Sequence, residues 1–280
     1  MAMDTTLILG ATGKTGRRIV RRLRAAGHSV RTASRTGSDV NVDLGDPATW
    51  PVALDGATAV YLLEPVLQPV PDRDARIPAF VAEAASAGVR RLVLLSAHGV
   101  GDATDDHPLK SAERAVRESG VGWTILRPGW FAQNFSEAFW KPWVLSGTLA
   151  VPTGDGRTPF IDAEDIAEVA ADALTDDRHN GRTYQLTGPR AIGFAEAAEI
   201  IGKAIGRTVR HVDVTPEVFA ERLTSNGVHA EAARMLAGLL ANIRDDREAA
   251  VSDGVDQALG RPPKPFEAYV AEAAAAGHWD

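Results

Sequence analysis

The alternation of short β-rich runs with helical stretches in the first half of the chain constrains the fold more than any other feature. Some of the β-rich runs, such as Leu92 to Leu95, are continuously apolar. Alternation of this kind predicts right-handed βαβ crossovers and a parallel sheet with helices on both faces, whose buried strands are apolar throughout. The predicted strands are Thr5–Gly10, Ser29–Ser34, Val40–Asp43, Ala57–Leu63, Leu92–Ser96 and Trp123–Arg127, and the predicted helices are Thr15–Ala26, Ala75–Ala87 and Lys110–Ser119.

The rhythm changes after Arg127, and the rest of the chain predicts a smaller, mainly helical lobe. Asp162 is a candidate N-cap for a helix over Ala163–Leu174. Further strands are expected at Gly147–Pro152, Thr183–Thr187 and Val209–Val214, and a last helix at Phe266–Ala276. The predicted fold class is therefore α/β, a Rossmann-type doubly wound parallel sheet formed by residues 1–127 and 157–189. Residues 128–156 and 190–280 would form a C-terminal lobe over the carboxyl edge of the sheet, where ligands bind in such folds.

A glycine-rich loop joins the first predicted strand to the first predicted helix. Its sequence is Gly10-Ala-Thr-Gly-Lys-Thr-Gly16, a spacing that 26 glycines in 280 residues produce easily by chance. Its position between a strand and a helix makes the glycine pattern informative. Glycine there lets the backbone turn tightly and approach a pyrophosphate at the helix N-terminus. A Walker A loop is excluded because Lys14 and Thr15 precede the third glycine. The loop predicts a dinucleotide site, and a plain glycine-rich turn is the alternative.

The end of the second predicted strand indicates which dinucleotide binds. An NAD site usually carries Asp or Glu there, whereas this chain has Ser34 and Arg35, and arginine can pair with a 2′-phosphate. NADP(H) is therefore favoured over a surface arginine in a turn. The segment Asp43-Leu44-Gly45-Asp46, after the third strand, lies where the adenine would rest, and Asp46 could equally be an N-cap before Pro47. The residues predicted to contact the cofactor are Gly10, Thr12, Gly13, Lys14, Thr15, Gly16, Arg35, Asp43, Leu44, Leu63, Glu64, Pro65, Ser96, Lys110 and Pro128.

The proton-handling groups expected near a nicotinamide are few. No tyrosine is followed four residues later by lysine, which disfavours the tyrosine-based mechanism of alcohol dehydrogenases and sugar epimerases. Lys110 opens the helix after the fifth strand, and His98 and His107 lie on the loop before it. These three residues are the catalytic candidates. A solvated lysine in a first helical turn is the alternative for Lys110.

Aromatic residues concentrate between Trp130 and Trp143. They form either a core between the lobes or the wall of a pocket for a flat or apolar substrate, and both can hold. Asn134 is the polar group expected to orient a ligand there. The residues predicted to bind substrate are Trp130, Phe131, Asn134, Phe135 and Trp140.

Composition excludes several classes of protein. The chain has no cysteine, which rules out disulfides, thiolate catalysis and Cys-ligated zinc, and is consistent with a cytoplasmic location. No metal-ligand spacing of histidines occurs, so no metal is expected. A net charge of −7 argues against nucleic acid, and the basic run from Arg17 to Arg24 is expected to be a solvated helix face. No membrane span or signal peptide is expected.

Taken together, several segments resemble the NmrA-like atypical short-chain dehydrogenases over nearly the whole chain. They are Gly10–Gly16, Arg35, Leu94-Leu-Ser96, Lys110-Ser-Ala-Glu113, Trp123 to Phe131 and Leu259-Gly-Arg-Pro-Pro. Val60 to Pro65 and Asp155 to Phe160 resemble the quinone or azo reductase and ergot-alkaloid dehydrogenase branch.

The resemblance implies an NADPH-dependent oxidoreductase that moves hydride to a small unsaturated, quinone, carbonyl or imine substrate. It also implies, from the isoflavone-reductase branch, that Lys110 serves the nicotinamide ribose and proton transfer. The group contains redox-sensing regulators that bind NADP(H) without catalysis, so a regulator is the second hypothesis. A non-redox isomerase or cyclase on the same fold is the third. The sequence leaves the oligomeric state open.

Overall fold

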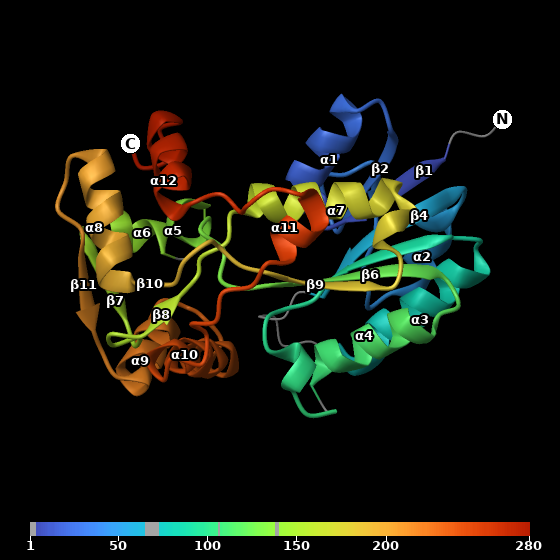
Figure 1. Ribbon diagram of the computed structural model, residues 1–280. Coiled ribbons are helices and arrows are strands. Elements are labelled where there is room, and N and C mark those ends of the chain that lie inside the picture. Colours follow the sequence, from blue (N-terminus) through green and yellow to red (C-terminus); the bar gives the residue numbers. More distant parts are fainter. Residues whose placement is uncertain (1–3, 65–72, 106, 138–139) are drawn as a thin grey trace.

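The computed structural model describes residues 4–64, 73–105, 107–137 and 140–280. A seven-stranded parallel sheet forms the core of one of its two lobes (Figure 1). The strand order is β3-β2-β1-β4-β5-β6-β9, and every neighbouring pair runs parallel. The predicted Rossmann-type sheet is therefore confirmed. In that order the strands are Val40–Asn41, Ser29–Ser34, Thr5–Leu9, Ala57–Leu63, Arg91–Leu95, Gly122–Pro128 and Arg182–Leu186.

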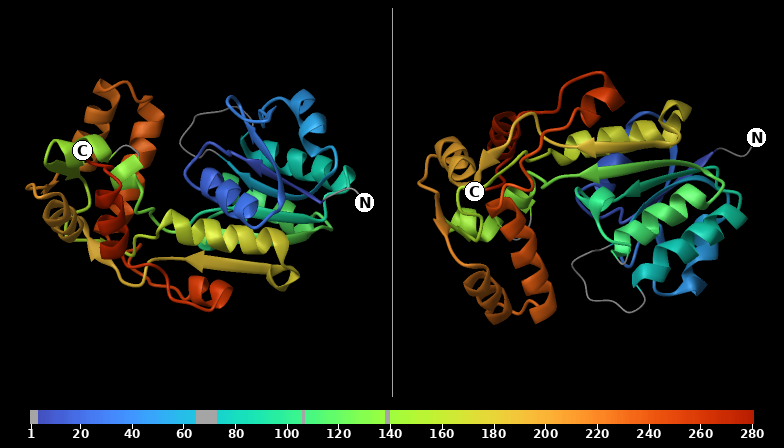
Figure 2. Two further views of the ribbon diagram at one scale, coloured as in Figure 1. Left: turned by 90° about the horizontal axis from the view of Figure 1, so that it is seen from above. Right: turned by 60° about the horizontal axis from the view of Figure 1, so that its bottom comes forward.

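Helices cover both faces of the sheet, as the two views in Figure 2 show. Along β1, Ile8 packs with the helices of one face, whereas Leu7 and Leu9 pack with those of the other. Because both faces are covered, successive residues of a central strand are all buried, which explains the continuous apolar runs. The first face carries α1 (Gly16–Ala25), α7 (Ala163–Thr175) and α11 (Gly254–Leu259), and the second carries α2 (Trp50–Leu54), α3 (Arg73–Ser86) and α4 (Pro108–Glu118).

The direction of the strand order reverses between β1 and β4. From β1 the chain moves outward to β2 and β3, and it then returns to the other side of β1 to form β4, β5 and β6. Such a switch point leaves a crevice at the carboxyl ends of the strands, which is the usual ligand site in open α/β sheets.

The second lobe surrounds a core of its own, which is rich in aromatic side chains. Two small sheets support it, an antiparallel pair formed by β8 and β10 and a parallel pair formed by β7 and β11. Its elements are α5 (Asn134–Glu137), α6 (Lys141–Leu145), β7 (Thr148–Val151), β8 (Arg157–Thr158), β10 (Ile192–Gly193), α8 (Phe194–Ile205), β11 (Arg210–Asp213), α9 (Pro216–Ser225), α10 (Ala230–Arg244) and α12 (Phe266–Ala275). Within the described ranges, no helix is long and apolar enough to cross a membrane.

Helix α11 packs against the sheet domain, although its residues fall within the range predicted for the second lobe. Val255 and Ala258 of α11 belong to the core beneath α1 and α7 rather than to the core of the second lobe. The helix can dock there because Gly254 has no side chain, since a Cβ at this position would lie 1.9 Å from the Gln185 carbonyl oxygen. The sequence did not predict that α11 packs against the sheet domain, and it did not predict α2, β8 or β10 either.

The basic side of α1 is solvated only in part: Arg17, Arg21 and Arg24 are exposed, as predicted, but Arg18 is not. Arg18 is buried and pairs with Glu137 of α5 at 2.6 Å and with Glu164 of α7 at 2.9 Å. Arg21 and Arg22 also pair with Glu164. The acidic partners come from segments more than a hundred residues away in sequence, so periodicity alone does not reveal them. This network ties the second lobe, through α5, to the sheet domain.

Candidate functional site

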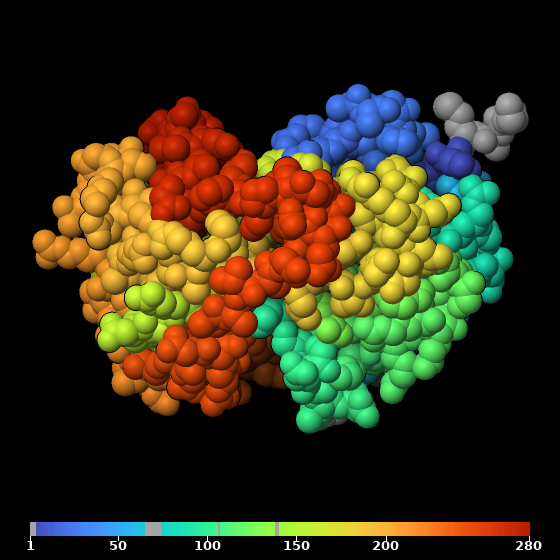
Figure 3. Space-filling model, in the orientation of Figure 1, coloured from blue at the N-terminus to red at the C-terminus, as the bar shows by residue number. Residues whose placement is uncertain are grey.

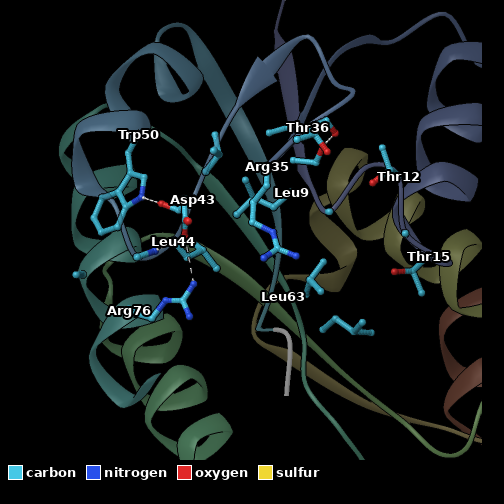
Figure 4. A pocket seen from close by; sticks show the side chains of 18 of the residues that line it. Leu9, Thr12, Thr15, Arg35, Thr36, Asp43, Leu44, Trp50, Leu63 and Arg76 are labelled. Atoms are coloured by element: carbon cyan, nitrogen blue, oxygen red, sulfur yellow. Dashed lines mark hydrogen bonds and ion pairs between the residues drawn. The ribbon is translucent and has the colours of Figure 1, made fainter. Parts of the chain in front are cut away.

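A cavity of about 830 Å³ lies at the switch point of the sheet (Figure 4). This volume is within the range typical of small-molecule and cofactor sites. Its walls come from the segments that follow β1, β2 and β3, from the ends of β4 and β5, from α3, and from Phe131. The predicted position of the ligand site, at the carboxyl edge of the sheet, is where the cavity lies.

The glycine loop forms one wall of the cavity and turns too tightly for side chains at two of its positions. Gly10 has a φ of +62°, and a Cβ on Gly16 would lie 2.2 Å from the Gly10 carbonyl oxygen. At Gly13 the same oxygen would be 3.1 Å from a Cβ. Gly10 and Gly16 are therefore required by the internal geometry of the loop. Gly13 lines the cavity, where the missing side chain leaves room for a ligand.

The loop also presents unused hydrogen-bond donors. Within the described part of the chain, the backbone N–H groups of Thr12, Lys14 and Thr15 donate no hydrogen bond, and all three residues line the cavity. Helix α1 begins at the next residue, so its positive dipole end adds to these donors. A glycine cradle with free N–H groups at a helix N-terminus fits a pyrophosphate.

Two further contacts shape this glycine loop. The Tyr61 hydroxyl donates a hydrogen bond to Thr15 Oγ1 at 2.8 Å, and burial raises the pKa of Tyr61, so the phenol stays a neutral donor. The Thr15 hydroxyl hydrogen is thereby left to point elsewhere. Burial lowers the pKa of Lys14, and the nearby Glu137 carboxylate opposes that shift. The Lys14 side chain lies beside the loop and lines the cavity.

Arg35 lines the cavity at the tip of β2, where the sequence predicts a 2′-phosphate contact. Its side chain is exposed, and none of the described carboxylates forms an ion pair with it. Ser34 is engaged in the turn, where its hydroxyl bonds with the Ser38 hydroxyl at 2.7 Å. Asp39 is bonded to Thr32 rather than to Arg35. Its carboxylate accepts a hydrogen bond from the Thr32 N–H at 2.9 Å, and its own N–H donates to Thr32 Oγ1 at 3.0 Å. The tip of β2 therefore offers a guanidinium that pairs with none of the acids in the described part of the chain.

A second arginine, which the sequence did not indicate, faces the same part of the cavity. Arg76 of α3 pairs with Asp43 at 3.6 Å and with Glu64 at 3.4 Å, and it points toward the cavity opposite Arg35 (Figure 4). Trp50 Nε1 donates to the Asp43 carbonyl oxygen at 2.9 Å, and the indole lines the cavity. The only available signal for Arg76 was its place in the first turn of the helix that follows β4.

The predicted cofactor residues divide into those that line the cavity and those that do not. Gly16 opens α1 directly behind the loop, Glu64 is buried beside Arg76, and Pro65 lies outside the described residues. Ser96, Lys110 and Pro128 are absent from the cavity wall. The residues that do line it are Gly10, Thr12, Gly13, Lys14, Thr15, Arg35, Asp43, Leu44 and Leu63.

Ser96 takes part in a buried polar network at the ends of β5 and β6. Its hydroxyl donates to Glu113 at 2.7 Å, and Arg127 donates to the same carboxylate at 2.8 Å and 2.6 Å. Glu113 is fully buried. Burial opposes its ionisation, but the hydrogen bonds from Arg127 and Ser96 outweigh burial and lower the pKa of Glu113. Glu113 thus fixes Ser96 in place, a role that its occurrence in the Lys110-Ser-Ala-Glu113 segment did not reveal.

Lys110 is not directed at the cavity in this structure. Its ammonium group donates to the carbonyl oxygens of Gly101 and Ala103, at 2.7 Å and 3.1 Å, and so closes the loop between β5 and α4. The sequence predicted α4 correctly, but a helix position alone does not show where a long, flexible side chain points.

We predict that Lys110→Met leaves the Kd for NADPH within about threefold of wild type and lowers the free energy of unfolding by about 1–2 kcal/mol, because two loop carbonyl groups lose their donor. An ammonium that anchored the ribose would instead contribute more than about tenfold in affinity. Fluorescence titration and urea unfolding measure the two quantities. A tenfold rise in the Kd for NADPH with unchanged stability would instead indicate that Lys110 contacts the cofactor.

The two candidate histidines have different surroundings. The His107 side chain accepts a hydrogen bond from the Leu109 N–H at 3.2 Å and so caps α4. His98 lies just beyond β5, and its Nε2 is 4.0 Å from a carboxylate oxygen of Glu248.

The aromatic segment serves mainly as core. Phe135 and Trp140 are fully buried, and they contact one another and Phe160 and Phe194. Fully buried rings present no surface to a ligand, so the structure assigns these two residues to the core rather than to a substrate pocket. Trp130 is half-buried and stacks on Trp140, and Asn134 is buried. Among the described residues of this segment, Phe131 lines the cavity.

Comparison with known proteins identifies the family. Residues 10–177 match the model of the NAD(P)H-binding family. The chain belongs to this family. The NAD(P)H azoreductase of Xenophilus azovorans is 33% identical, with 96% of this chain and 98% of that protein covered. The agroclavine dehydrogenase of Claviceps fusiformis is 31% identical, with 96% of each chain covered.

A solved structure shows the same fold. The triphenylmethane reductase of Citrobacter sp., complexed with NADP(H), superposes with a TM-score of 0.80 at 21% identity, covering 96% of this chain and 99% of that one. The predicted resemblance to the azo reductase and ergot-alkaloid dehydrogenase branch is confirmed. So is the prediction of an NAD(P)H-dependent reductase.

Proposed function

We propose that this protein is an NADPH-dependent reductase that transfers hydride to a small, flat, unsaturated acceptor such as a quinone, an azo compound, a carbonyl or an imine. The observation that carries the cofactor assignment is the exposed Arg35 guanidinium at the tip of β2, which pairs with no described carboxylate because Asp39 is bonded to Thr32 instead. The acceptor class is supported by the relatives named as azoreductase and triphenylmethane reductase, and by the apolar end of the cavity.

Each wall of the cavity has a separate task in this proposal. A bound dinucleotide supplies the hydride from its nicotinamide. The N–H groups of the glycine loop and the Lys14 ammonium bind the pyrophosphate, and Arg35 binds the 2′-phosphate. Arg76, Asp43 and Trp50 hold the adenosine end. Leu63, Leu95 and Phe131, from β4, β5 and the segment after β6, exclude water from the other end.

Arg35→Ala should weaken NADPH binding by about tenfold or more and leave NADH binding nearly unchanged. A charge-assisted hydrogen bond to phosphate contributes about 1.5–3 kcal/mol, and NADH has no phosphate at this position. Both cofactors can be titrated by fluorescence. Arg90→Ala is the matched control, because Arg90 is an exposed arginine paired with Asp4. Equal weakening of both cofactors would overturn the 2′-phosphate assignment.

Turnover is tested by following the loss of NADPH absorbance with quinones, azo dyes, enones and iminium compounds. We expect reduction of at least one class, and faster reduction with NADPH than with NADH. Tight and selective NADPH binding without reduction of any acceptor would overturn the reductase and favour a redox-sensing regulator.

A further inference from the structure

A histidine and a glutamate from the two lobes face one another beside the carboxyl ends of β5 and β6. His98 is fixed there by its backbone N–H, which donates to the Pro128 carbonyl oxygen at 2.9 Å. Its Nε2 lies 4.0 Å from Glu248 Oε2, and the two side chains are 22% and 16% exposed. His98 Nδ1 is buried and has no hydrogen-bond partner among the described residues. One side of the imidazole thus faces a carboxylate, and the other makes no hydrogen bond with a described residue.

The segment that carries Glu248 is fastened to the rest of the protein on both sides. Before it, Arg244 donates to the carbonyl oxygens of Pro152 and Val214, at 3.1 Å and 2.9 Å. After it, the Ser252 hydroxyl donates to the Gln185 carbonyl oxygen at 2.6 Å. Figure 3 shows this segment, between α10 and α11, crossing the face of the molecule from one lobe to the other.

The turn just before Glu248 is strained. Asp246 adopts a φ of 56°, in the left-handed region that residues other than glycine rarely occupy, and it is held there by the Arg157 N–H, which donates to its carboxylate at 3.2 Å. Strained backbone of this kind persists where the surrounding structure fixes it, and it occurs often at functional sites. The constraints place the Glu248 carboxylate opposite His98.

The pair lies on the side of the switch point where the nicotinamide half of a dinucleotide would lie. The adenosine-binding residues Arg35 and Asp43 follow β2 and β3, on one side of β1. The rest of the dinucleotide must therefore extend over β4, β5 and β6. His98 is three residues beyond Leu95, the β5 residue that lines the cavity.

We propose that His98 donates the proton that completes the reduction, and that Glu248 is the positioning residue that orients its imidazole. This inference rests on the proposed reductase function. The acceptor gains a hydride at one atom of its double bond, and the π electron pair moves to the other atom. That second atom takes the proton from the imidazolium, which becomes neutral imidazole and regains a proton from water. The 4.0 Å separation is longer than a hydrogen bond, as is common for catalytic groups before a ligand binds.

If His98 is the proton donor, neutral and cationic acceptors should depend on it differently. Quinones, enones and azo compounds are neutral, so each needs one proton in addition to the hydride. An iminium ion or a cationic triphenylmethane dye is neutralised by hydride alone and needs no proton. A proton donor should therefore matter for the first class and not for the second, whereas a residue that only supports the fold should affect both classes equally.

The kinetic test compares His98→Asn and Glu248→Gln with wild type on one acceptor of each class. For a neutral quinone or azo dye we expect kcat to fall by about 10²-fold or more in His98→Asn, because general acids typically contribute 10²–10⁴-fold. We expect a smaller loss, roughly tenfold, in Glu248→Gln, which keeps the shape but not the charge. With the cationic acceptor both variants should stay within about twofold of wild type.

Matched controls are His28→Asn, an exposed histidine, and Asp245→Asn, an exposed acid of the same turn as Glu248. Both should behave as wild type on both acceptors. Equal losses on the two classes, or no loss on the neutral one, would overturn the role of His98. Reduction of neither class by wild type would overturn the reductase function itself.

A second measurement does not depend on turnover. The ¹⁵N resonances of the His98 ring report which nitrogen carries the proton and how strongly it is bound, and His98→Asn assigns them. Glu248→Gln should shift these resonances and leave those of His28 in place. An unchanged His98 ring in Glu248→Gln would overturn the pairing.

Discussion

Glu113→Ala should lower the free energy of unfolding by about 3–5 kcal/mol, because removal of one partner from a buried ion pair leaves the other charge uncompensated. Glu113 is fully buried and accepts hydrogen bonds from Arg127 and Ser96, while Arg127 is itself only 12% exposed. Urea unfolding followed by circular dichroism measures the change. The same variant should also impair acceptor reduction, since Ser96 and the end of β5 lose their anchor.

Arg117→Ala is the matched control for this prediction. Arg117 pairs with the same carboxylate at 3.0 Å but is 36% exposed, so its removal should cost less than about 1 kcal/mol. Equal destabilisation by the two variants would contradict the assignment of the stability to the buried Glu113–Arg127 pair.

The pH dependence of stability follows from the same group. Because the pKa of Glu113 is lower in the folded protein than in the unfolded chain, its contribution is fully present above the ordinary glutamate range. The contribution is lost as the pH falls through the lowered folded-state pKa. Glu113→Gln should therefore show less loss of stability on acidification than wild type does.

Gly16→Val should abolish dinucleotide binding, with a loss of affinity of about a hundredfold or more. A side chain at this position would begin 2.2 Å from the Gly10 carbonyl oxygen, so the loop must change its path. The backbone N–H groups of Thr12, Lys14 and Thr15 would then no longer converge on a phosphate. Losing two such charge-assisted hydrogen bonds costs about 3–6 kcal/mol, which corresponds to at least two powers of ten in Kd. NADPH titration by calorimetry measures the loss.

Gly238→Ala provides the control for glycine replacement. Gly238 lies within α10, and a Cβ there would meet nothing within 4 Å, so the variant should bind NADPH as wild type does. Circular dichroism must show that Gly16→Val remains folded. If folded Gly16→Val binds NADPH normally, the phosphate site does not lie on this loop.

The sequence by itself determined the sheet and the end of the cavity that the glycine loop and Arg35 line, because both depend on short stretches of neighbouring residues. Apolar runs such as Leu92 to Leu95 predict strands buried on both faces, and alternation with helices then leaves little choice of topology. The spacing of Gly10, Gly13 and Gly16 is likewise a local requirement, since the loop and the helix start lie within seven residues. Arg35 could be predicted because the end of the second strand has a known place in such a fold.

The tertiary structure decided the parts of the site that depend on contacts between distant segments. Arg76 meets Asp43, Glu113 meets Arg127, and His98 meets Glu248 only after the chain has folded, and none of these pairs has a characteristic spacing. The same reason explains the errors. Arg18 of α1 is buried because Glu137 and Glu164 arrive from other elements, and Trp140 is core because the second lobe closes around it. Periodicity gives the direction of a side chain relative to its own helix or strand, and only the packed structure shows what that side chain meets.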